Sequence, residues 1–391
     1  MSTDEQGGQW DADSDPVAIR PFRIDVPDAD LDDLRARLRR TRWPDPETVE
    51  DWSQGVPLSY IQELCRYWCD DYEWRETEKR LNGFDHFKAR IDGLDHHFIH
   101  ARSPHPNALP LVMTHGWPGS VVEFVNVLGP LTDPTAHGGD AADAFHVVCP
   151  SLPGYGFSEK PTTPGWTVER IARAWAVLMA ELSYERYGAQ GGDWGALVTA
   201  AVGRTDPEHV VGIHSNMPFG RPEPEAELRA EEEEAVSALA AWQLSEAGYS
   251  GIQATRPQTL GYGLADSPAG QLAWIVEKFK VWTDCDGHPE NALSRQQMLD
   301  NVMLYWLPGT GASSARLYWE SRRTFDASPV GVPAGCSIFP KEVIKPLRPW
   351  VEKRFTDLRY WNELDKGGHF AALEQPELFV SEVRSFFGLV R

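Results

Sequence analysis

One aspartate stands in a glycine-rich turn that could expose its carboxylate for chemistry. Asp193 lies at the centre of residues 191–195, which read GGDWG. Small residues around a central one are typical of a sharp strand-to-helix turn that presents a nucleophile. A carboxylate, with a reference pKa of about 4, is anionic at neutral pH and can attack an electrophilic carbon without help from a base. The alternative is a plain turn, because glycine and aspartate are also the usual turn residues.

A second glycine-rich loop could help to cleave the ester that such an attack would leave on Asp193. Ester cleavage needs an oxyanion hole, built from the backbone N–H after the nucleophile and another N–H in a loop after an earlier strand. These two positions are Trp194 and Trp117, the latter in the loop 115–119, which reads HGWPG. We expect His115 to fix this loop rather than to act as the base, because the base in this arrangement lies near the C-terminus.

A histidine and a carboxylate in the last third of the chain could activate the water that cleaves the ester. His369 lies in a glycine-rich stretch near the C-terminus and is the expected base. Glu342 is the expected acid that orients it, with a surface-exposed Glu342 as the alternative. The other position for an acid, after the strand ending at Ser215, holds Asn216, and Asp365 is too close in sequence to His369.

The elements that must position these residues follow an alternation of short apolar strands and amphipathic helices. This alternation predicts a mostly parallel sheet covered by helices on both faces. Together with the nucleophile turn around Asp193, it predicts the α/β-hydrolase fold. Strands are predicted at 86–91, 97–101, 109–114, 145–149, just before Gln190, at 332–339 and at 358–361, and helices at 121–131, 168–182 and 376–387.

The chain divides into four predicted regions. Residues 1–18 form an acidic, polar leader that we expect to be disordered. Residues 19–83 form a helical segment packed on the core, with helices at 30–40, 58–70 and 74–81. The core comprises 84–217 and 329–391, and residues 218–328, rich in Trp and Tyr, form a helical cap between its two parts.

The bulk properties restrict the location and the partners. A formal net charge of −21 disfavours nucleic acid and anionic membrane surfaces. No apolar run is long enough to span a bilayer, and the N-terminus lacks the features of a signal peptide. Five scattered cysteines indicate reduced thiols and a cytoplasmic protein. Cys65 and Cys69 lack a second ligand pair, so no metal and no cofactor is expected.

Taken together, these residues resemble the microsomal-type epoxide hydrolases over nearly the whole chain from about Ile19. The specific strings are HGWPGS at 115–120, GGDWG at 191–195, LYW at 304–306 and GGHF at 367–370. Segment 19–83 is similar to the N-terminal wrapping segment of that family. Membrane-bound relatives carry an N-terminal anchor that this chain lacks, so it resembles soluble bacterial members, and most closely actinobacterial ones that act on enediyne-type intermediates. Homodimers are frequent among relatives.

The resemblance implies a pair of cap tyrosines that hydrogen-bond the epoxide oxygen and protonate it as the ring opens. Residue by residue they fall on Tyr249 and Tyr318, with Tyr305 of the LYW string as the reserve candidate. A phenol with a pKa of about 10 can protonate a strongly basic alkoxide without being ionised at rest. Trp242, Tyr305 and Phe370 are further expected residues of the substrate pocket.

The resulting hypothesis is that this enzyme converts an epoxide into a vicinal diol through an ester on Asp193. A haloalkane dehalogenase is the nearest alternative, but those enzymes typically have Asn where Trp117 stands and need no tyrosine pair. A hydrolase-fold protein that only binds a ligand is the second alternative. The density of aromatic residues in the cap favours an apolar or aromatic epoxide; these residues are Trp242, Tyr249, Tyr262, Trp274 and Trp282.

Overall fold

A nine-stranded sheet forms the centre of the protein. The computed structural model describes residues 17–222, 227–322, 324 and 326–391, so most of the expected disordered leader 1–18 lies outside the described residues. The strand order is β1-β2-β3-β5-β4-β6-β7-β8-β9, with antiparallel pairing from β1 to β5 and parallel pairing beyond it. The strands are β1 Ile19–Phe22, β2 His86–Ile91, β3 Leu94–Ala101, β4 Leu109–Thr114, β5 Phe145–Pro150, β6 Tyr187–Gly191, β7 Val210–Ser215, β8 Ala334–Ile338 and β9 Leu358–Glu363.

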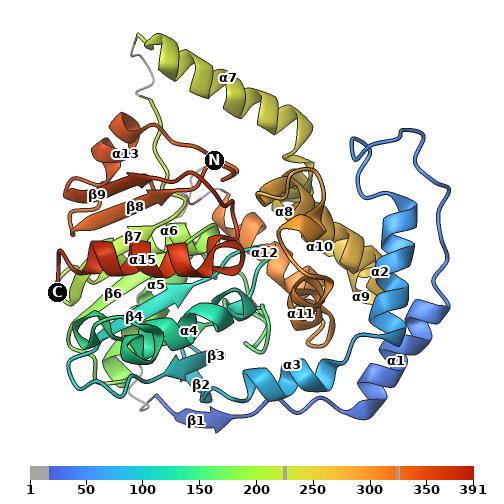
Figure 1. Cartoon of the computed structure of the whole chain (residues 1–391), viewed down its shortest axis with the longest axis horizontal. Helices are drawn as coiled ribbons and strands as arrows, with labels where there is room; N and C mark the ends of the chain where they lie inside the picture. Colours follow the sequence, from blue (N-terminus) through green and yellow to red (C-terminus); the bar gives the residue numbers. More distant parts are fainter. Residues whose placement is uncertain (1–16, 223–226, 323, 325) are drawn as a thin grey trace, which may run out of the picture.

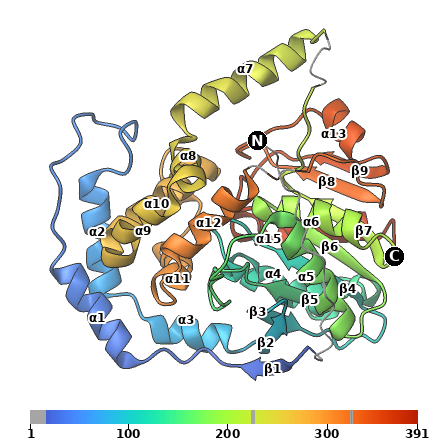
Figure 2. The same cartoon turned by 180° about the vertical axis from the view of Figure 1, so that it is seen from behind.

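Helices cover both faces of the sheet, as the alternation of elements predicts (Figures 1 and 2). One apolar cluster contains the inner sides of α5 and α6, and a second contains those of α4 and α15. The predicted helix 121–131 begins as a 3-10 turn, η1, before it continues as α4. The core helices are η1 Val121–Phe124, α4 Val125–Thr132, η2 Pro134–His137, η3 Ala141–Asp143, α5 Val168–Glu181, α6 Trp194–Thr205, α13 Arg348–Arg354, α14 Ala371–Glu374 and α15 Pro376–Phe387.

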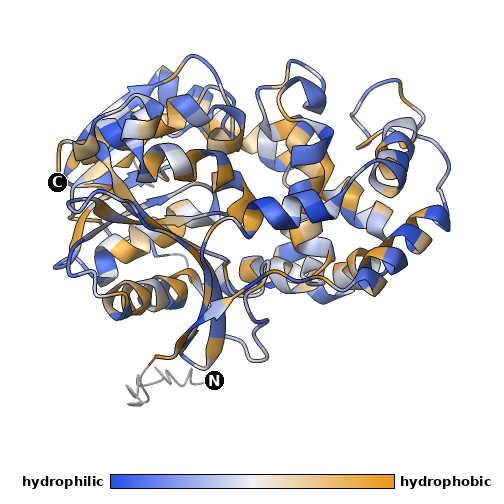
Figure 3. Cartoon of the chain, turned by 60° about the horizontal axis from the view of Figure 1, so that its bottom comes forward, coloured by the Kyte–Doolittle hydropathy of each residue, from blue (hydrophilic) through white to orange (hydrophobic). Residues whose placement is uncertain are grey.

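A helical cap lies between β7 and β8 in sequence and packs over one end of the sheet (Figure 1). Most helices in Figure 3 mix hydrophobic and hydrophilic residues along the ribbon, as expected for one buried and one exposed face. Across the described ranges, no helix combines the length and the apolar character needed to cross a lipid bilayer. The cap helices are α7 Ala230–Ser245, α8 Gly248–Thr255, α9 Pro257–Asp266, α10 Pro268–Trp282, η4 Pro289–Asn291, α11 Arg295–Trp306 and α12 Gly311–Ser321.

The N-terminal segment begins at the edge of the sheet and then wraps around the cap. Its helices are α1 Asp28–Arg39, α2 Leu58–Asp70 and α3 Trp74–Leu81, and α1 and α2 pack on α10. The sequence analysis expected only helices here, whereas Ile19–Phe22 forms the edge strand β1 against β2. Four residues are too few for a periodic signal, and Pro21 is tolerated because an edge strand leaves one row of backbone groups unpaired.

A buried carboxylate, Asp300 of α11, fixes this segment to the cap. The hydroxyl of Tyr72 donates to it at 2.9 Å and that of Thr77 at 2.6 Å, and Arg80 forms an ion pair with it. The side-chain amide of Gln296 donates at 2.9 Å to Asp300 Oδ1, the oxygen that also accepts from Tyr72 and Thr77. Asp300 has no exposed surface, so these donors replace the water that would otherwise solvate its charge.

We predict that Asp300→Ala lowers the free energy of unfolding by about 2–4 kcal/mol, because each buried hydroxyl left without an acceptor costs about 1–3 kcal/mol. Urea denaturation followed by tryptophan fluorescence measures the change. Asp33→Ala is the control, since Asp33 forms an exposed ion pair with Arg37 on α1 and exposed pairs contribute less than about 1 kcal/mol. Equal effects of the two substitutions would contradict the prediction.

Candidate active site

Asp193 occupies a strained turn between β6 and α6. Its backbone has φ 51° and ψ −129°, a left-handed conformation that is unusual for a residue other than glycine. The turn requires glycine at two positions, since a Cβ on Gly195 would lie 1.8 Å from the Thr114 carbonyl oxygen and one on Gly191 would lie 2.2 Å from the Gly195 oxygen. This close approach of α6 to the ends of β4 and β6 presents the Asp193 carboxylate at the carboxyl edge of the sheet.

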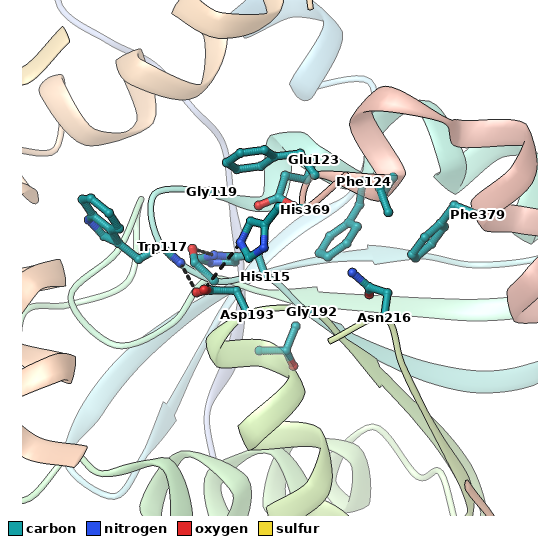
Figure 4. A pocket seen from close by; sticks show the side chains of 15 residues that line it. His115, Trp117, Gly119, Glu123, Phe124, Gly192, Asp193, Asn216, His369 and Phe379 are labelled. Atoms are coloured by element: carbon teal, nitrogen blue, oxygen red, sulfur yellow. Dashed lines mark hydrogen bonds and ion pairs between the residues drawn. The ribbon is translucent and has the colours of Figure 1, made fainter. Parts of the chain in front are cut away.

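The expected oxyanion loop lies against this carboxylate. The Trp117 backbone N–H donates to Asp193 Oδ1 at 2.7 Å (Figure 4). Trp194, the other expected donor, is the first residue of α6, where backbone N–H groups have no partner within the helix. One carboxylate oxygen is therefore held by a backbone donor, and the other is left for different interactions.

His115 stabilises the oxyanion loop, as the sequence analysis predicted. It is buried, and its Nε2 accepts from the Leu152 N–H at 3.3 Å. Its Nδ1 therefore carries the hydrogen that is donated to the Gly116 carbonyl at 2.9 Å. Burial lowers the pKa of His115 to about 4, so the ring is neutral and both nitrogens have a partner.

His369 lies between two carboxylates. Its Nδ1 donates to Glu342 Oε1 at 2.6 Å. On the other side of the ring, Nε2 lies 3.5 Å from Asp193 Oδ2 (Figure 4). The surface-exposed alternative for Glu342 is wrong, because the residue is 5% exposed. Asp365 is exposed, and Asn216 accepts a hydrogen bond from Gln190 at 2.9 Å.

The charges around His369 determine its protonation. Burial lowers the pKa of the imidazole, but the charge of Glu342 and the hydrogen bond and charge of Asp193 outweigh burial and raise the pKa well above its usual value. The ring is therefore an imidazolium while both carboxylates are ionised. Loss of either negative charge would lower its pKa.

A cavity of about 590 Å³ opens from Asp193 and His369 toward the cap. Tyr249 and Tyr318 both line it, with ring centroids 5.9 Å apart and planes at 81°. Tyr249 stacks on Trp117 at 5.1 Å, and Tyr318 meets Trp194 edge-on at 4.8 Å. The expected pocket residue Trp242 also lines this cavity.

Both cavity tyrosines are held in the neutral form. Burial raises the pKa of Tyr249 above its usual value, and the charge of Asp193 raises it further. Burial also raises the pKa of Tyr318, followed by its proximity to Tyr249 and Asp193. A phenol that resists ionisation keeps its proton until a strongly basic oxygen is present.

Two of the expected pocket residues, Tyr305 and Phe370, do not line the large cavity, and Phe370 instead lines a smaller cavity at Asp193 and His369. Tyr305 donates its hydroxyl to the Gly119 carbonyl at 2.7 Å and does not line the large cavity, so it contributes to the core. Phe370 packs on Phe279 with ring centroids 4.8 Å apart and also lies outside that cavity. Sequence order could not separate Tyr305 from Tyr318, because the direction of each side chain depends on how α11 and α12 pack on the core.

A second, small cavity of about 20 Å³ touches the same pair of residues from the core side (Figure 4). It shares only Asp193 and His369 with the large cavity. Its lining includes Glu123, which the sequence analysis did not single out, and Asn216. The available signal was a lone acidic residue within the apolar stretch VVEF at 121–124. Among the residues with described positions, no group of His, Cys, Asp and Glu is suited to hold a metal ion.

Comparisons with known proteins agree with this arrangement. The family described as "Epoxide hydrolase N terminus" matches residues 19–124, and that described as "alpha/beta hydrolase fold" matches 110–249. A Stigmatella aurantiaca protein, named as a candidate epoxide hydrolase, is 54% identical over 95% of this chain and 86% of its own length. Epoxide hydrolase 1 of Sus scrofa is 36% identical over 98% of this chain and 92% of its own.

Solved structures show the same likeness. The juvenile hormone epoxide hydrolase of Bombyx mori superposes with a TM-score of 0.87 at 32% identity, covering 96% of this chain and 95% of that chain. The Aspergillus niger epoxide hydrolase superposes with a TM-score of 0.86 at 31% identity, covering 96% of this chain and 97% of that chain. The likeness extends over the N-terminal segment and the cap as well as the sheet, because the covered share is nearly the entire chain.

We predict that Asp193→Asn lowers the pKa of His369. Asp193 and Glu342 both raise this pKa, and the substitution leaves the negative charge of Glu342 but removes that of Asp193. NMR titration of histidine-labelled protein measures the change, with the His369 signal assigned through His369→Gln. His209 is the internal control, since it is exposed and pairs with Asp206. An unchanged His369 pKa would show that Asp193 does not set it.

Proposed function

This chain belongs to the epoxide hydrolase family, and from that premise we propose that it forms the diol through a covalent ester on Asp193. It is an epoxide hydrolase, with an epoxide and water as its substrates. The observation that carries the proposed mechanism is the position of His369, with Nδ1 on Glu342 and Nε2 3.5 Å from Asp193. The base thus contacts the acid through one ring nitrogen and faces the nucleophile through the other, and the nucleophile and base both line the large cavity.

In the first step, Asp193 Oδ2 attacks a ring carbon of the epoxide. Oδ1 stays on the Trp117 N–H, so the attacking oxygen is the one without that bond. As the new C–O bond forms, the C–O bond of the ring breaks, and its oxygen takes a proton from Tyr249 or Tyr318. The product is a glycol monoester of Asp193. Tyr249 and Tyr318 support this step, because both line the cavity that contains Asp193 and their rings are neighbours in it.

In the second step, water cleaves the ester. His369 Nε2 takes a proton from the water as its oxygen attacks Asp193 Cγ, and the negative charge that develops on Oδ1 is stabilised by the N–H groups of Trp117 and Trp194. The Cγ–O bond to the glycol then breaks, and the imidazolium protonates the leaving oxygen. The proton that remains on the released Asp193 carboxyl passes to His369 and restores the resting carboxylate and imidazolium. Glu342 stabilises the imidazolium while it exists.

The two steps are linked through the charge of Asp193. The carboxylate raises the pKa of His369, and esterification removes that charge. The pKa of His369 therefore falls when the ester has formed. Its proton then replaces the one that the tyrosine gave to the epoxide oxygen, and the neutral ring can act as a base in the second step. This coupling needs no movement of the protein, because it follows from Coulomb interaction over the 3.5 Å separation.

The cavity favours an apolar or aromatic epoxide. Its volume of about 590 Å³ lies within the range of small-molecule sites. Aromatic and aliphatic side chains line most of it: Trp242, Trp282, Phe219, Leu197, Met217 and Ile344. Tyr262 and Trp274 do not line it, so part of the aromatic density in the cap serves packing. An enediyne-type substrate, a cytoplasmic location and a homodimer stay predictions.

The test of the mechanism is a single turnover in ¹⁸O-labelled water with enzyme in excess over styrene oxide. We predict unlabelled diol in the first turnover, because the oxygen added to the substrate comes from Asp193, and labelled Asp193 after that turnover. Mass spectrometry of the diol and of the peptide containing Asp193 measures both. Labelled diol in the first turnover would overturn the covalent mechanism. A parallel assay of halide release from haloalkanes tests the dehalogenase alternative.

We further predict that Tyr249→Phe and Tyr318→Phe each slow ester formation by about 10–100-fold, because the alkoxide then leaves with one hydrogen-bond donor fewer. Rapid-quench mass spectrometry of the intact protein measures the rate. Tyr262→Phe is the matched control, since Tyr262 is 71% exposed and lies outside the cavity. If ester formation keeps the wild-type rate in both variants, the tyrosines are not the proton donors.

A further inference from the structure

Asp193 and His369 form the boundary between two cavities of very different size. The large cavity takes in the cap and its tyrosines, and the small one lies among η1, α14 and the oxyanion loop. Among the residues that the structure describes, Asp193 and His369 alone line both cavities. An epoxide in the large cavity therefore reaches Asp193 from one side and leaves the other side accessible. At about 20 Å³, the small cavity has room for one water molecule.

Glu123 of η1 places a carboxyl group at the small cavity. Figure 4 shows its side chain directed toward the imidazole of His369. Space for this carboxyl exists because residue 119 is glycine, since a Cβ on Gly119 would lie 1.5 Å from Glu123 Oε1. Besides its place in the turn, Gly119 of the HGWPG loop therefore lets an acidic side chain from the next element reach the reacting groups.

The charge state of Glu123 suits a hydrogen-bonding role. Burial raises the pKa of its carboxyl to about 8, the His369 charge lowers it, and the Asp193 charge raises it. At neutral pH the group is therefore mostly protonated. It has one O–H donor, it accepts from the Ser120 backbone N–H, and its carbonyl oxygen has two lone pairs and so can accept more than one hydrogen bond. A third carboxylate at this place would hold His369 in the imidazolium form. A neutral acid avoids that effect and still offers polar atoms to water.

We propose that Glu123 positions the hydrolytic water in the small cavity. The carbonyl oxygen of Glu123 accepts one O–H of this water, and the other O–H points at His369 Nε2, which directs the water oxygen to Cγ of the Asp193 ester. When the water oxygen bonds to Cγ, the water proton goes to His369 Nε2, and Glu123 neither gains nor loses a proton. Glu123 is a positioning residue, since it holds the water rather than reacting with it. This inference rests on the proposed covalent mechanism.

The placement explains why the two half-reactions do not compete for space. The epoxide and its glycol ester occupy the large cavity, and the water lies in the small cavity on the opposite side of the Asp193 carboxyl. Water held there can reach Cγ while the glycol is still in place. Because Glu123 does not line the large cavity, its removal should leave substrate binding and ester formation intact.

The experiment compares the full-length wild type with Glu123→Leu and Glu123→Gln, using styrene oxide in rapid-quench single turnovers. Intact-protein mass spectrometry follows the formation and decay of the ester. We expect Glu123→Leu to form the ester within about twofold of the wild-type rate and to cleave it about 100-fold more slowly, because a misplaced reactant costs about that factor. Glu123→Gln keeps a carbonyl acceptor and a similar size, so it should cleave the ester at least about tenfold faster than Glu123→Leu does.

The outcomes are separable. Wild-type ester decay in Glu123→Leu would overturn the inference, as would equal slowing of ester formation and decay, which indicates a general packing role. Equal defects in the Leu and Gln variants would also overturn it. If the wild type forms no ester, the covalent mechanism itself fails, and the inference fails with it. Normal ester formation in each variant shows on the same sample that the protein is folded.

Discussion

The close approach of helix α6 to strand β4 is the constraint on which the site depends. At Gly195 the helix backbone comes so near the Thr114 carbonyl that no side chain fits between them. Directly before this contact, Asp193 has a positive φ and its carboxylate lies at the carboxyl edge of the sheet. The contact also brings the end of β4, and with it the Trp117 N–H, to 2.7 Å from that carboxylate. The nucleophile and its oxyanion donor therefore lie at one packing contact.

Trp117 connects this contact to the cap. Its backbone binds Asp193, and its indole ring stacks on Tyr249 and meets Tyr318 edge-on at 5.9 Å. A shift of the cap would therefore change both tyrosines relative to the carboxylate. The N-terminal segment opposes such a shift, because Asp300 joins the cap to α3 through buried hydrogen bonds. The wrapping segment thus contributes to the geometry of a site that it does not touch.

Electrostatics divides the roles of the acidic groups around one imidazole. Asp193 and Glu342 both contact His369 and raise its pKa, whereas burial keeps Glu123 mostly neutral. Among these three acidic groups, only Asp193 changes its charge in the proposed mechanism, and the protonation of His369 responds to that change. The same low-dielectric surroundings that raise the pKa of Glu123 also strengthen the coupling between Asp193 and His369. Burial therefore sets both the resting state and the response of the base.

Residues whose role is local could be identified from the amino-acid order alone. The turn around Asp193, the HGWPG loop and the strands and helices near them follow from short-range steric rules and periodicity, and the α/β-hydrolase fold and the family followed from them. Only the tertiary structure decided which side chains meet. It placed Tyr318 in the cavity and Tyr305 in the core, buried Glu342, added β1 to the sheet edge, and brought Glu123 beside His369. These outcomes depend on how distant segments pack, and no local pattern encodes the direction from which a neighbour arrives.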